Sequence, residues 1–288
     1  MVVVWVLLAF GVAIGSIVAA VLLRLPQVDL DVTQTVGEEL RRSPRIRHFL
    51  RSRLEPGVAT GLALTAAMLA TIVGGTVIGI LVYVVRRNGG VVGWDQQVAV
   101  WAGDHASPLS TRLLDLITSL GMTVTIIVVA IAAGIYGSRR WRRPSVLSFL
   151  LLVVGGQLLI SNLIKTGVAR ARPDIHPLAG FSGASFPSGH ATASAATFAA
   201  VALILGRGRS PTVRALLGGV AAGLAVGVSC SRVFLGVHWA SDVVAGLALG
   251  WSWFAVCCLA FGGRILRFGA PAEIVAAPAS PVPDRQGP

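Results

Sequence analysis

Long apolar stretches alternate with short basic segments along most of the chain. A membrane-spanning helix needs about 20 predominantly apolar residues. Seven stretches approach or exceed that length: 2–23, 58–85, 116–136, 145–165, 190–206, 213–231 and 239–262. The pattern predicts an all-α, polytopic membrane helical bundle. The intervening segment 86–115 is expected to be a mixed loop, with Trp94 and Trp101 as anchors at the membrane interface.

The two ends of the chain differ from the rest in composition. Residues 1–23 lack a basic leading segment and a clear small-residue cleavage site, so we interpret them as a retained span rather than a signal peptide. Residues 24–57 are an arginine-rich connector, expected in the cytoplasm as a topological anchor or as an amphipathic helix on anionic lipid. The main transmembrane domain is predicted over 58–265. The Pro- and Ala-rich tail 266–288 is expected to be disordered.

Composition agrees with a membrane protein. Hydrophobic residues make up 55% of the chain and charged residues 12%, against about 25% charged in soluble domains. The net charge of +12 does not predict a nucleic-acid partner, because the arginines cluster in short loops and no basic face with interleaved aromatic residues is present. Three cysteines lie within apolar stretches and are interpreted as small buried hydrophobic residues: Cys230, Cys257 and Cys258.

The arginines predict the orientation of the spans. They gather in four segments: 41–53, 139–143, 207–214 and 264–267. With seven spans, all four segments fall on one side of the membrane, which the positive-inside rule makes the cytoplasm. Arg86 and Arg87 violate this rule, although nearby acidic residues dilute their charge. The opposite, non-cytoplasmic face then carries the N-terminus and three loops: 86–115, 166–189 and 232–238.

The first candidate for chemistry is a pair of cations after the span 145–165. Lys165 and Arg172 are seven residues apart, about two helical turns, so on a helix they would project from one face until Pro173 ends it. Two such cations can hold a doubly charged phosphate. The alternative is a snorkelling lysine and a topological arginine. Arg170 is a weaker candidate, interpreted as a lipid-headgroup contact.

The second candidate opens the span 190–206 with the sequence Pro-Ser-Gly-His. Ser188 suits a helix N-cap, and Gly189 allows the backbone to approach a ligand closely. The N–H groups and dipole at the start of a helix favour a bound anion. His190 would lie beside that anion in the first turn, where it could exchange a proton. The alternative is an ordinary capped helix with a histidine at the interface.

The third candidate contains Arg232, His238 and Asp242. His238 and Asp242 are four residues apart at the start of the last span, so they are expected to meet on one helix face. A carboxylate bonded to one ring nitrogen leaves the lone pair of the other nitrogen free, as a nucleophilic histidine requires. The alternative is a structural His–Asp pair. All three candidates fall on the same predicted face, which unrelated structural features would not be expected to do.

Together the three sequence blocks resemble the signature of the type-2 phosphatidic acid phosphatase superfamily. That signature is a lysine separated by six residues from Arg-Pro, then Pro-Ser-Gly-His, then Ser-Arg followed by a histidine and an aspartate. The chain matches every block, and the resemblance covers about residues 60–262. It implies a six-span phosphatase core, to which the N-terminal span is an addition. The signature is specific for the superfamily and not for the substrate.

The resemblance also implies roles for individual residues. His238 is expected to be the nucleophile that forms a phosphohistidine, Asp242 to orient it, and His190 to act as general acid and then as base. The phosphate oxygens are expected to be bound by Lys165, Arg172, Ser188, Gly189 and Arg232. No metal or other cofactor is expected, because the sequence offers no carboxylate cluster for a two-metal site.

These observations predict a metal-independent hydrolase of a lipid phosphate or polyprenyl diphosphate, working at the non-cytoplasmic face of the plasma membrane. Undecaprenyl-type diphosphate and phosphatidate are two candidate substrates. A lipid phosphotransferase would use the same residues, so that alternative stays open. A vanadate-dependent haloperoxidase shares the anion site, but such relatives are soluble. A non-catalytic transporter or scaffold would not need the intact histidines and aspartate. The lipid and the oligomeric state are left open.

Overall fold

The computed structural model describes residues 1–24, 58–87, 89–142, 144–175, 177–180 and 183–265. The predicted connector and tail therefore lie outside the described residues, apart from Arg24. Within the described part the chain forms helices and loops and no strand. The helices are α1 (Val2–Arg24), α4 (Val58–Arg86), α5 (Val91–Asp104), α6 (Pro108–Ser119), α7 (Thr123–Trp141), α8 (Ser145–Val168), α9 (Gly189–Gly206), α10 (Pro211–Phe234) and α11 (Ala240–Ile265).

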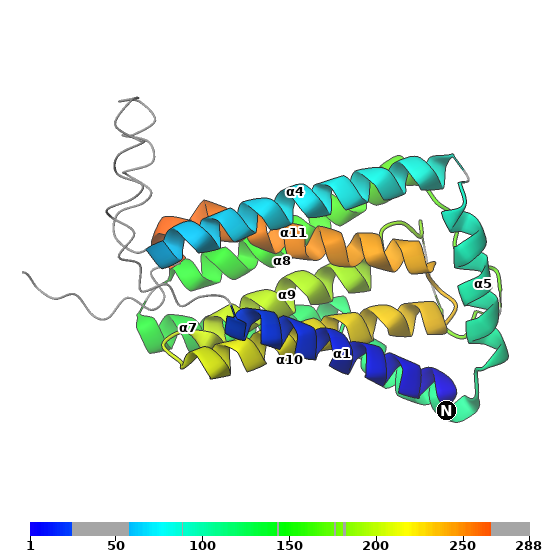
Figure 1. The fold of residues 1–288 in the computed structure, drawn as a ribbon, viewed down its shortest axis with the longest axis horizontal. Helices are drawn as coiled ribbons and strands as arrows, with labels where there is room; N and C mark the ends of the chain where they lie inside the picture. The colour runs from blue at the N-terminus through cyan, green and yellow to red at the C-terminus, as the bar shows by residue number, and fades with distance from the viewer. Residues whose placement is uncertain (25–57, 88, 143, 176, 181–182, 266–288) are drawn as a thin grey trace, which may run out of the picture.

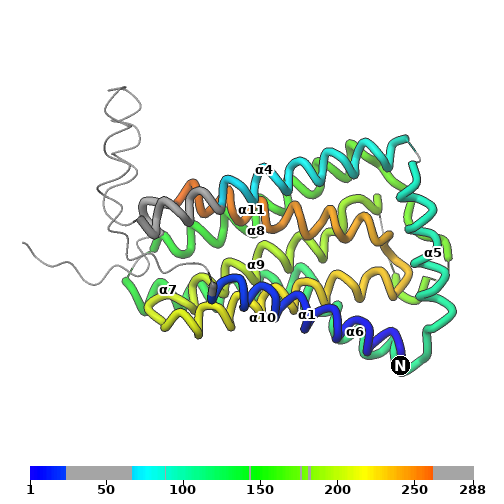
Figure 2. The backbone as a smooth tube through the Cα atoms, viewed as in Figure 1, coloured from blue at the N-terminus to red at the C-terminus, as the bar shows by residue number. Residues whose placement is uncertain are grey.

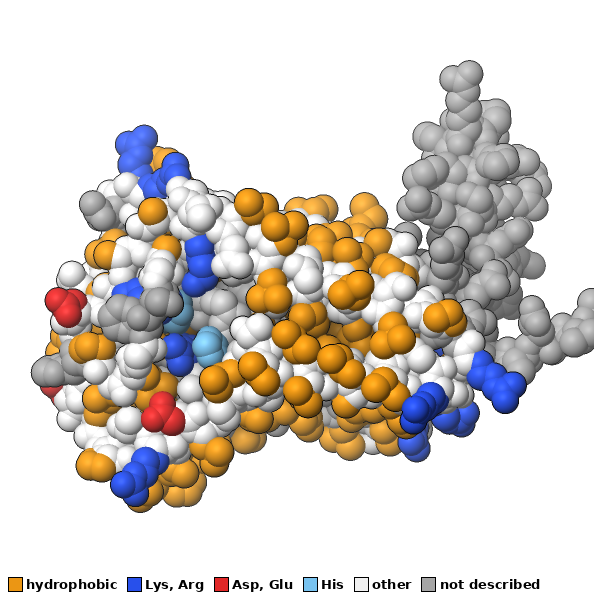
Figure 3. All heavy atoms as spheres, turned by 180° about the vertical axis from the view of Figure 1, so that it is seen from behind, with side chains coloured by type: hydrophobic (Ala, Val, Ile, Leu, Met, Phe, Trp, Pro, Cys, Tyr) orange, Lys and Arg blue, Asp and Glu red, His pale blue; other side chains and the backbone are white. Residues whose placement is uncertain are grey.

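Seven of the described helices are long and apolar enough to cross a membrane: α1, α4, α7, α8, α9, α10 and α11. This confirms the predicted helical membrane bundle. Its outer surface carries a belt of exposed aliphatic side chains, with Lys and Arg side chains gathered toward both ends (Figure 3). The chain is thus a multi-pass membrane protein whose apolar belt faces lipid, because helices can satisfy their backbone polar groups internally.

The segment 86–115 is helical, so the predicted mixed loop is wrong. Ser107 starts α6 with a capping box, in which its Oγ accepts the N–H of Ser110, and Pro108 occupies the first helical position. The predicted span from 116 therefore begins later, at Thr123. Trp94 is exposed as expected of an anchor. Trp101 instead stacks on His105, with the ring centroids 4.7 Å apart.

The first span packs backbone to backbone against α10 (Figure 1). A Cβ atom on Gly219 would lie 2.5 Å from the carbonyl oxygen of Gly15, and one on Gly11 would lie 3.2 Å from that of Gly223. Each helix thus presents two glycines four residues apart, the spacing that lets membrane helices approach closely. The N-terminal addition is therefore a tightly fitted part of the bundle.

The centre of the bundle is α9, which lies between α8, α10 and α11 (Figures 1 and 2). Two glycines of α11 seat it against the start of α9. A Cβ atom on Gly246 would lie 2.7 Å from the Ser188 carbonyl oxygen, and one on Gly250 would lie 2.5 Å from that of Thr192. The starts of α9 and α11 therefore meet at one end of the bundle. Helices α8 and α10 end there, and α5 covers that end (Figure 1).

We predict that Gly219→Ala lowers the free energy of unfolding by about 1–2 kcal/mol, because the new methyl group must displace the backbone of α1. Gly75→Ala is the matched control, since a Cβ atom there meets nothing within 4 Å and the helix propensity of alanine is higher. Thermal unfolding of both variants in detergent measures the difference. Equal stability of Gly219→Ala and the wild type would contradict the close packing of α1 on α10.

Candidate active site

The structure brings the residues singled out from the sequence to the same end of the bundle. Lys165 is in the last turn of α8, and Arg232 is in the last turn of α10. The α9 start supplies Ser188, Gly189 and His190. The remaining three come from the loop after α8 and from the segment that opens α11: Arg172, His238 and Asp242. In space-filling view, histidine side chains lie in a hollow at this end (Figure 3).

Lys165 and Arg172 do not share a helix face, so that prediction is wrong. Helix α8 ends at Val168 because Ala169 adopts a left-handed conformation and donates its N–H to the Lys165 carbonyl at 2.9 Å. The chain then turns back over the site. Lys165 Nζ and Arg172 Nη2 both donate to the carbonyl oxygen of Ala184, at 3.1 and 3.4 Å. The loop, and not the helix, holds the two cations together.

Arg172 also fixes the ring of His238. Its Nη1 donates to the Val237 carbonyl at 2.7 Å and lies 3.1 Å from His238 Nε2. Because a guanidinium only donates hydrogen bonds, Nε2 accepts and the ring proton is on Nδ1. Nδ1 lies 3.4 Å from both Ser185 Oγ and Asp242 Oδ2. The nitrogen with the lone pair therefore faces the cations.

The predicted pairing of His238 with Asp242 is present, but not on a helix face. Helix α11 begins at Ala240, after His238. The contact forms across the helix start, where Asp242 Oδ2 also accepts the N–H of Trp239 at 2.9 Å. Asp242 thus caps the helix and faces the histidine at once.

Burial sets the charge state of His238, which is 3% exposed. Burial lowers the pKa of His238 to about 4, and the hydrogen bond to Asp242 opposes that shift only in part. The imidazole is therefore neutral near neutral pH and keeps its lone pair. Burial also lowers the pKa of Arg172, which the Asp242 carboxylate partly offsets. An arginine remains charged over the physiological range even so.

Arg170 lies between two buried carboxylates, so its interpretation as a lipid-headgroup contact is wrong. Its Nη1 is 2.6 Å from Asp242 Oδ1, and its Nη2 is 2.7 Å from Asp95 Oδ2. Only 10% of the Arg170 side chain is exposed. A second oxygen of Asp242 accepts the hydroxyl of Ser185. Both oxygens of Asp242 therefore have partners. Arg170, the partner of Oδ1, also pairs with Asp95 and so connects Asp242 to α5.

Asp95 was not identified from the sequence as a site residue, although it ties α5 to the site. It is 1% exposed and accepts hydrogen bonds from the backbone N–H of Ser241, the Ser241 hydroxyl and Arg170. The available signal was a carboxylate in a mostly apolar segment, which is costly to bury without partners. Its partners lie far away in sequence, so no spacing could have identified them.

Arg232 and His190 complete the site on its other side. Arg232 is 7% exposed, and its Nη1 donates to Thr118 Oγ1 of α6 at 3.1 Å. Its Nε has no partner among the described residues. The turn before α7 seats His190, because a Cβ atom on Gly121 would lie 3.1 Å from His190 Cδ2. Thr118 and Gly121 were not identified from the sequence, since neither belongs to a recognisable motif.

Ser188 occupies the N-cap position of α9, as predicted, but its side chain makes no capping bond. Its Oγ is buried and has no partner within the described part of the chain. Its backbone N–H donates to the Asp242 carbonyl at 3.0 Å, which ties the starts of α9 and α11 together. The N–H groups in the first turn of a helix have no carbonyl of that helix to bond, so they can bind an anion.

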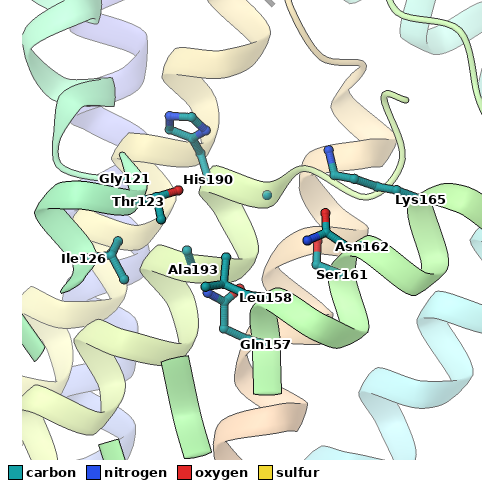
Figure 4. Close-up of a pocket in the computed structure, with 11 residues that line it drawn as sticks. Gly121, Thr123, Ile126, Gln157, Leu158, Ser161, Asn162, Lys165, His190 and Ala193 are labelled. Atoms are coloured by element: carbon teal, nitrogen blue, oxygen red, sulfur yellow. The ribbon is translucent and has the colours of Figure 1, made fainter. Parts of the chain in front are cut away.

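A cavity of about 230 Å³ adjoins this arrangement. Lys165, Gly189 and His190 are among the residues that line it. The side chains of Lys165 and His190 approach it from opposite sides (Figure 4). Lys165, the start of α9 and the His190 ring thus border a space large enough for a phosphate group, whereas Arg172, Arg232 and His238 are not among its lining residues. Among the described residues, no three His, Cys, Asp or Glu side chains are grouped so that they could hold a metal ion.

Comparisons with known proteins agree with this geometry. The sequence model of the PAP2 superfamily matches residues 145–265. The chain is 32% identical over 169 residues to phosphatidylglycerophosphatase B of Bacillus subtilis (strain 168), which covers 56% of the chain and 79% of that relative. It is 39% identical over 118 residues to lipid A 1-phosphatase of Rhizobium johnstonii, covering 38% of the chain and 43% of the relative.

A third relative is decaprenylphosphoryl-5-phosphoribose phosphatase of Mycobacterium tuberculosis, 38% identical over 110 residues, with 36% of the chain and 55% of the relative covered. The chain thus spans about half the length of the last two relatives. The crystal structure of a transmembrane PAP2 type phosphatidylglycerolphosphate phosphatase from Bacillus subtilis superposes with a TM-score of 0.63 at 28% identity. The match covers 69% of the chain and 98% of that structure. With its bundle and all three signature blocks, the chain belongs to the PAP2 superfamily.

Proposed function

We propose that the protein is a membrane phosphatase that hydrolyses the phosphate ester of a lipid through a phosphohistidine on His238. One observation carries this proposal: the lone pair of a neutral imidazole faces a fixed cation that has a second cation beside it. His238 Nε2 accepts a hydrogen bond from Arg172, and Lys165 lies beside Arg172 on the shared Ala184 carbonyl. A phosphate drawn to these cations would lie within reach of Nε2.

In the first step, the Nε2 lone pair attacks phosphorus and the bond from phosphorus to the lipid oxygen breaks. His190, in the first turn of α9, gives its proton to the leaving alkoxide. Arg172 has a second task, because its Nη1 donates to the Nε2 lone pair. When phosphate binds, the guanidinium exchanges that contact for a phosphate oxygen, and the nucleophile is released where it is needed.

In the second step, water attacks the phosphorus of the phosphohistidine and the bond to Nε2 breaks. His190, now neutral, takes a proton from that water, and inorganic phosphate leaves with its oxygens still bound. Charge grows on the equatorial oxygens in both steps, and Lys165, Arg172 and Arg232 are placed to stabilise it. The hydroxyl of Ser188 and the N–H of Gly189 would add neutral donors. We propose that these groups suffice without a metal ion.

The relatives support a lipid phosphate as substrate and water as acceptor. All three are named as phosphatases, and their names refer to phosphatidylglycerophosphate, lipid A 1-phosphate and a decaprenyl-linked phosphate. Glycerolipid phosphates and polyprenyl diphosphates are both consistent with the catalytic groups. Transfer of the phosphoryl group to another lipid or sugar would need the same residues, and no contact in the site favours it over hydrolysis.

We propose that the site faces the non-cytoplasmic side of the plasma membrane. The last turn of α7 carries Arg139 and Arg140, and the turn after α9 carries Arg207 and Arg209. These four arginines lie at the end of the bundle opposite the site, since α8 and α10 each cross the bundle once on their way to the site. Arg86 is an exception at the site end. Its Nη2 donates to the Gly167 carbonyl near the end of α8, so it has a structural use there.

This orientation predicts that a reporter inserted after residue 208 is cytoplasmic and that one inserted within 177–180 is external. Paired fusions to alkaline phosphatase and green fluorescent protein would measure both positions in cells, because the first is active only outside and the second fluoresces only inside. The opposite pattern would place the site in the cytoplasm and contradict the proposed face.

We predict that His238→Ala lowers kcat by about 10³-fold or more, because the imidazole is the attacking group. His105→Ala is the control, since His105 is exposed directly after α5, and its ring bonds the Trp101 carbonyl and stacks on Trp101. Release of inorganic phosphate from phosphatidate and from a polyprenyl diphosphate, in detergent with EDTA, measures the effect. Activity that survives His238→Ala would exclude His238 as the nucleophile, and loss of activity in EDTA would contradict the metal-independent mechanism.

A further inference from the structure

The cavity beside Lys165 does not end at the phosphate site. It continues into the membrane-spanning part of the bundle between α7, α8 and α9. Its deeper wall consists of Ile126, Gln157, Leu158, Ser161 and Ala193. Figure 4 shows Gln157 and Ser161 on α8 below Lys165, on the side of the cavity away from the phosphate site. A chain of polar groups thus leads from the site into an apolar region.

Two of these polar side chains are buried and unsatisfied. Gln157 is 1% exposed, and neither its Oε1 nor its Nε2 has a hydrogen-bond partner among the described residues. Ser161 is 4% exposed, and its Oγ is likewise unpaired within that part of the chain. An amide without a partner in an apolar environment is costly, and nearly all buried polar groups in native proteins are paired. Both residues line the cavity, so a ligand there could bond them.

The spacing of the polar groups matches a particular order of chemical groups. Gln157, Ser161 and Lys165 are four residues apart, so they lie along one face of α8 at steps of about 6 Å. A molecule whose phosphate is held at Lys165 would meet Ser161 next and Gln157 after it. Ile126 and Leu158 supply apolar contacts beside these polar groups (Figure 4). The cavity thus offers an anion site and then a region with both hydrogen-bonding and apolar groups.

We infer that Gln157 and Ser161 form a subsite for the ester linkage of a glycerolipid phosphate. Gln157 Nε2 and Ser161 Oγ would donate to the ester carbonyls that follow the phosphate, and Gln157 Oε1 would accept from a hydroxyl where the lipid has one. These two side chains determine specificity and take no part in the chemical step. The inference rests on the proposed phosphatase function, whose substrate class it narrows.

A polyprenyl diphosphate fits this subsite less well. It has a charged second phosphate where a glycerolipid has neutral ester carbonyls, and only hydrocarbon beyond. Its second phosphate would fall near Ser161 and Gln157, where the lining residues include no cation deeper than Lys165. A charge placed there would lose its hydration without gaining an ion pair. The cavity therefore favours the neutral, carbonyl-bearing linkage.

The test compares three substrates with purified, full-length protein: diacyl phosphatidate, its dialkyl ether analogue and a polyprenyl diphosphate. The ether analogue differs from phosphatidate only in lacking the ester carbonyls. We expect wild-type kcat/KM to be about five- to tenfold higher for the diacyl lipid than for its ether analogue, as expected for the loss of about one hydrogen bond. Gln157→Leu should remove most of that preference, and Ser161→Ala should reduce it.

Thr197→Val is the matched control. Thr197 is also buried with an unpaired hydroxyl, but it is absent from the lining of the cavity. It should therefore keep the wild-type ratio of diacyl to ether activity. Gln157→Leu should fold normally, because it removes an unpaired amide. If it does not fold, the Ser161→Ala ratio decides.

Two failures can be told apart. If the wild type hydrolyses these lipids but shows no preference for ester carbonyls, or if Gln157→Leu and Ser161→Ala keep that preference, the subsite is wrong and the phosphatase proposal stands. A polyprenyl diphosphate whose kcat/KM falls as much as that of phosphatidate in Gln157→Leu would also overturn the subsite. If the wild type releases phosphate from none of the three lipids, the proposed function fails and the subsite fails with it.

Discussion

The buried carboxylate of Asp242 is the interaction on which the site depends. One oxygen pairs with Arg170, and the other accepts the hydroxyl of Ser185 and the N–H of Trp239 while it faces His238. A charge buried in this way is tolerated only when its partners are well placed, and removing one partner leaves an uncompensated charge. Asp242 therefore holds the loop after α8, the start of α11 and the imidazole in one arrangement.

That arrangement reaches beyond the site. Arg170 also forms an ion pair with Asp95 of α5. Asp95 in turn accepts the N–H of Ser241, so it ties α5 across the end of the bundle to α11. The glycines of α11 let its first turns pack closely against α9. The start of α9, which carries His190, is therefore held next to the start of α11, which carries Asp242. The result is a site in which the proposed nucleophile, the proposed proton donor and the cations come from separate segments but are joined by shared contacts. Such preorganisation is what stabilisation of a phosphoryl transition state requires.

Much of this could be predicted from the sequence. Hydropathy identified the spans, since a lipid-facing helix needs a long apolar run, and the three motifs placed the candidate residues at one end. Local geometry was less accessible. Nothing marks Ala169 as the left-handed residue that ends α8, so Lys165 and Arg172 were expected on one helix. Arg170 and Asp95 are joined only in three dimensions, and Gln157 became informative only when its lack of a partner was visible in the fold.

The most direct test of the account is to trap the covalent intermediate. The purified protein would be mixed with a lipid phosphate labelled on its phosphoryl group and quenched in alkali, where a phosphohistidine survives, and the labelled peptide would be identified by mass spectrometry. The account predicts label on His238 and none in His238→Ala. Label on another residue, or turnover without any labelled peptide at any quench time, would contradict nucleophilic attack by His238.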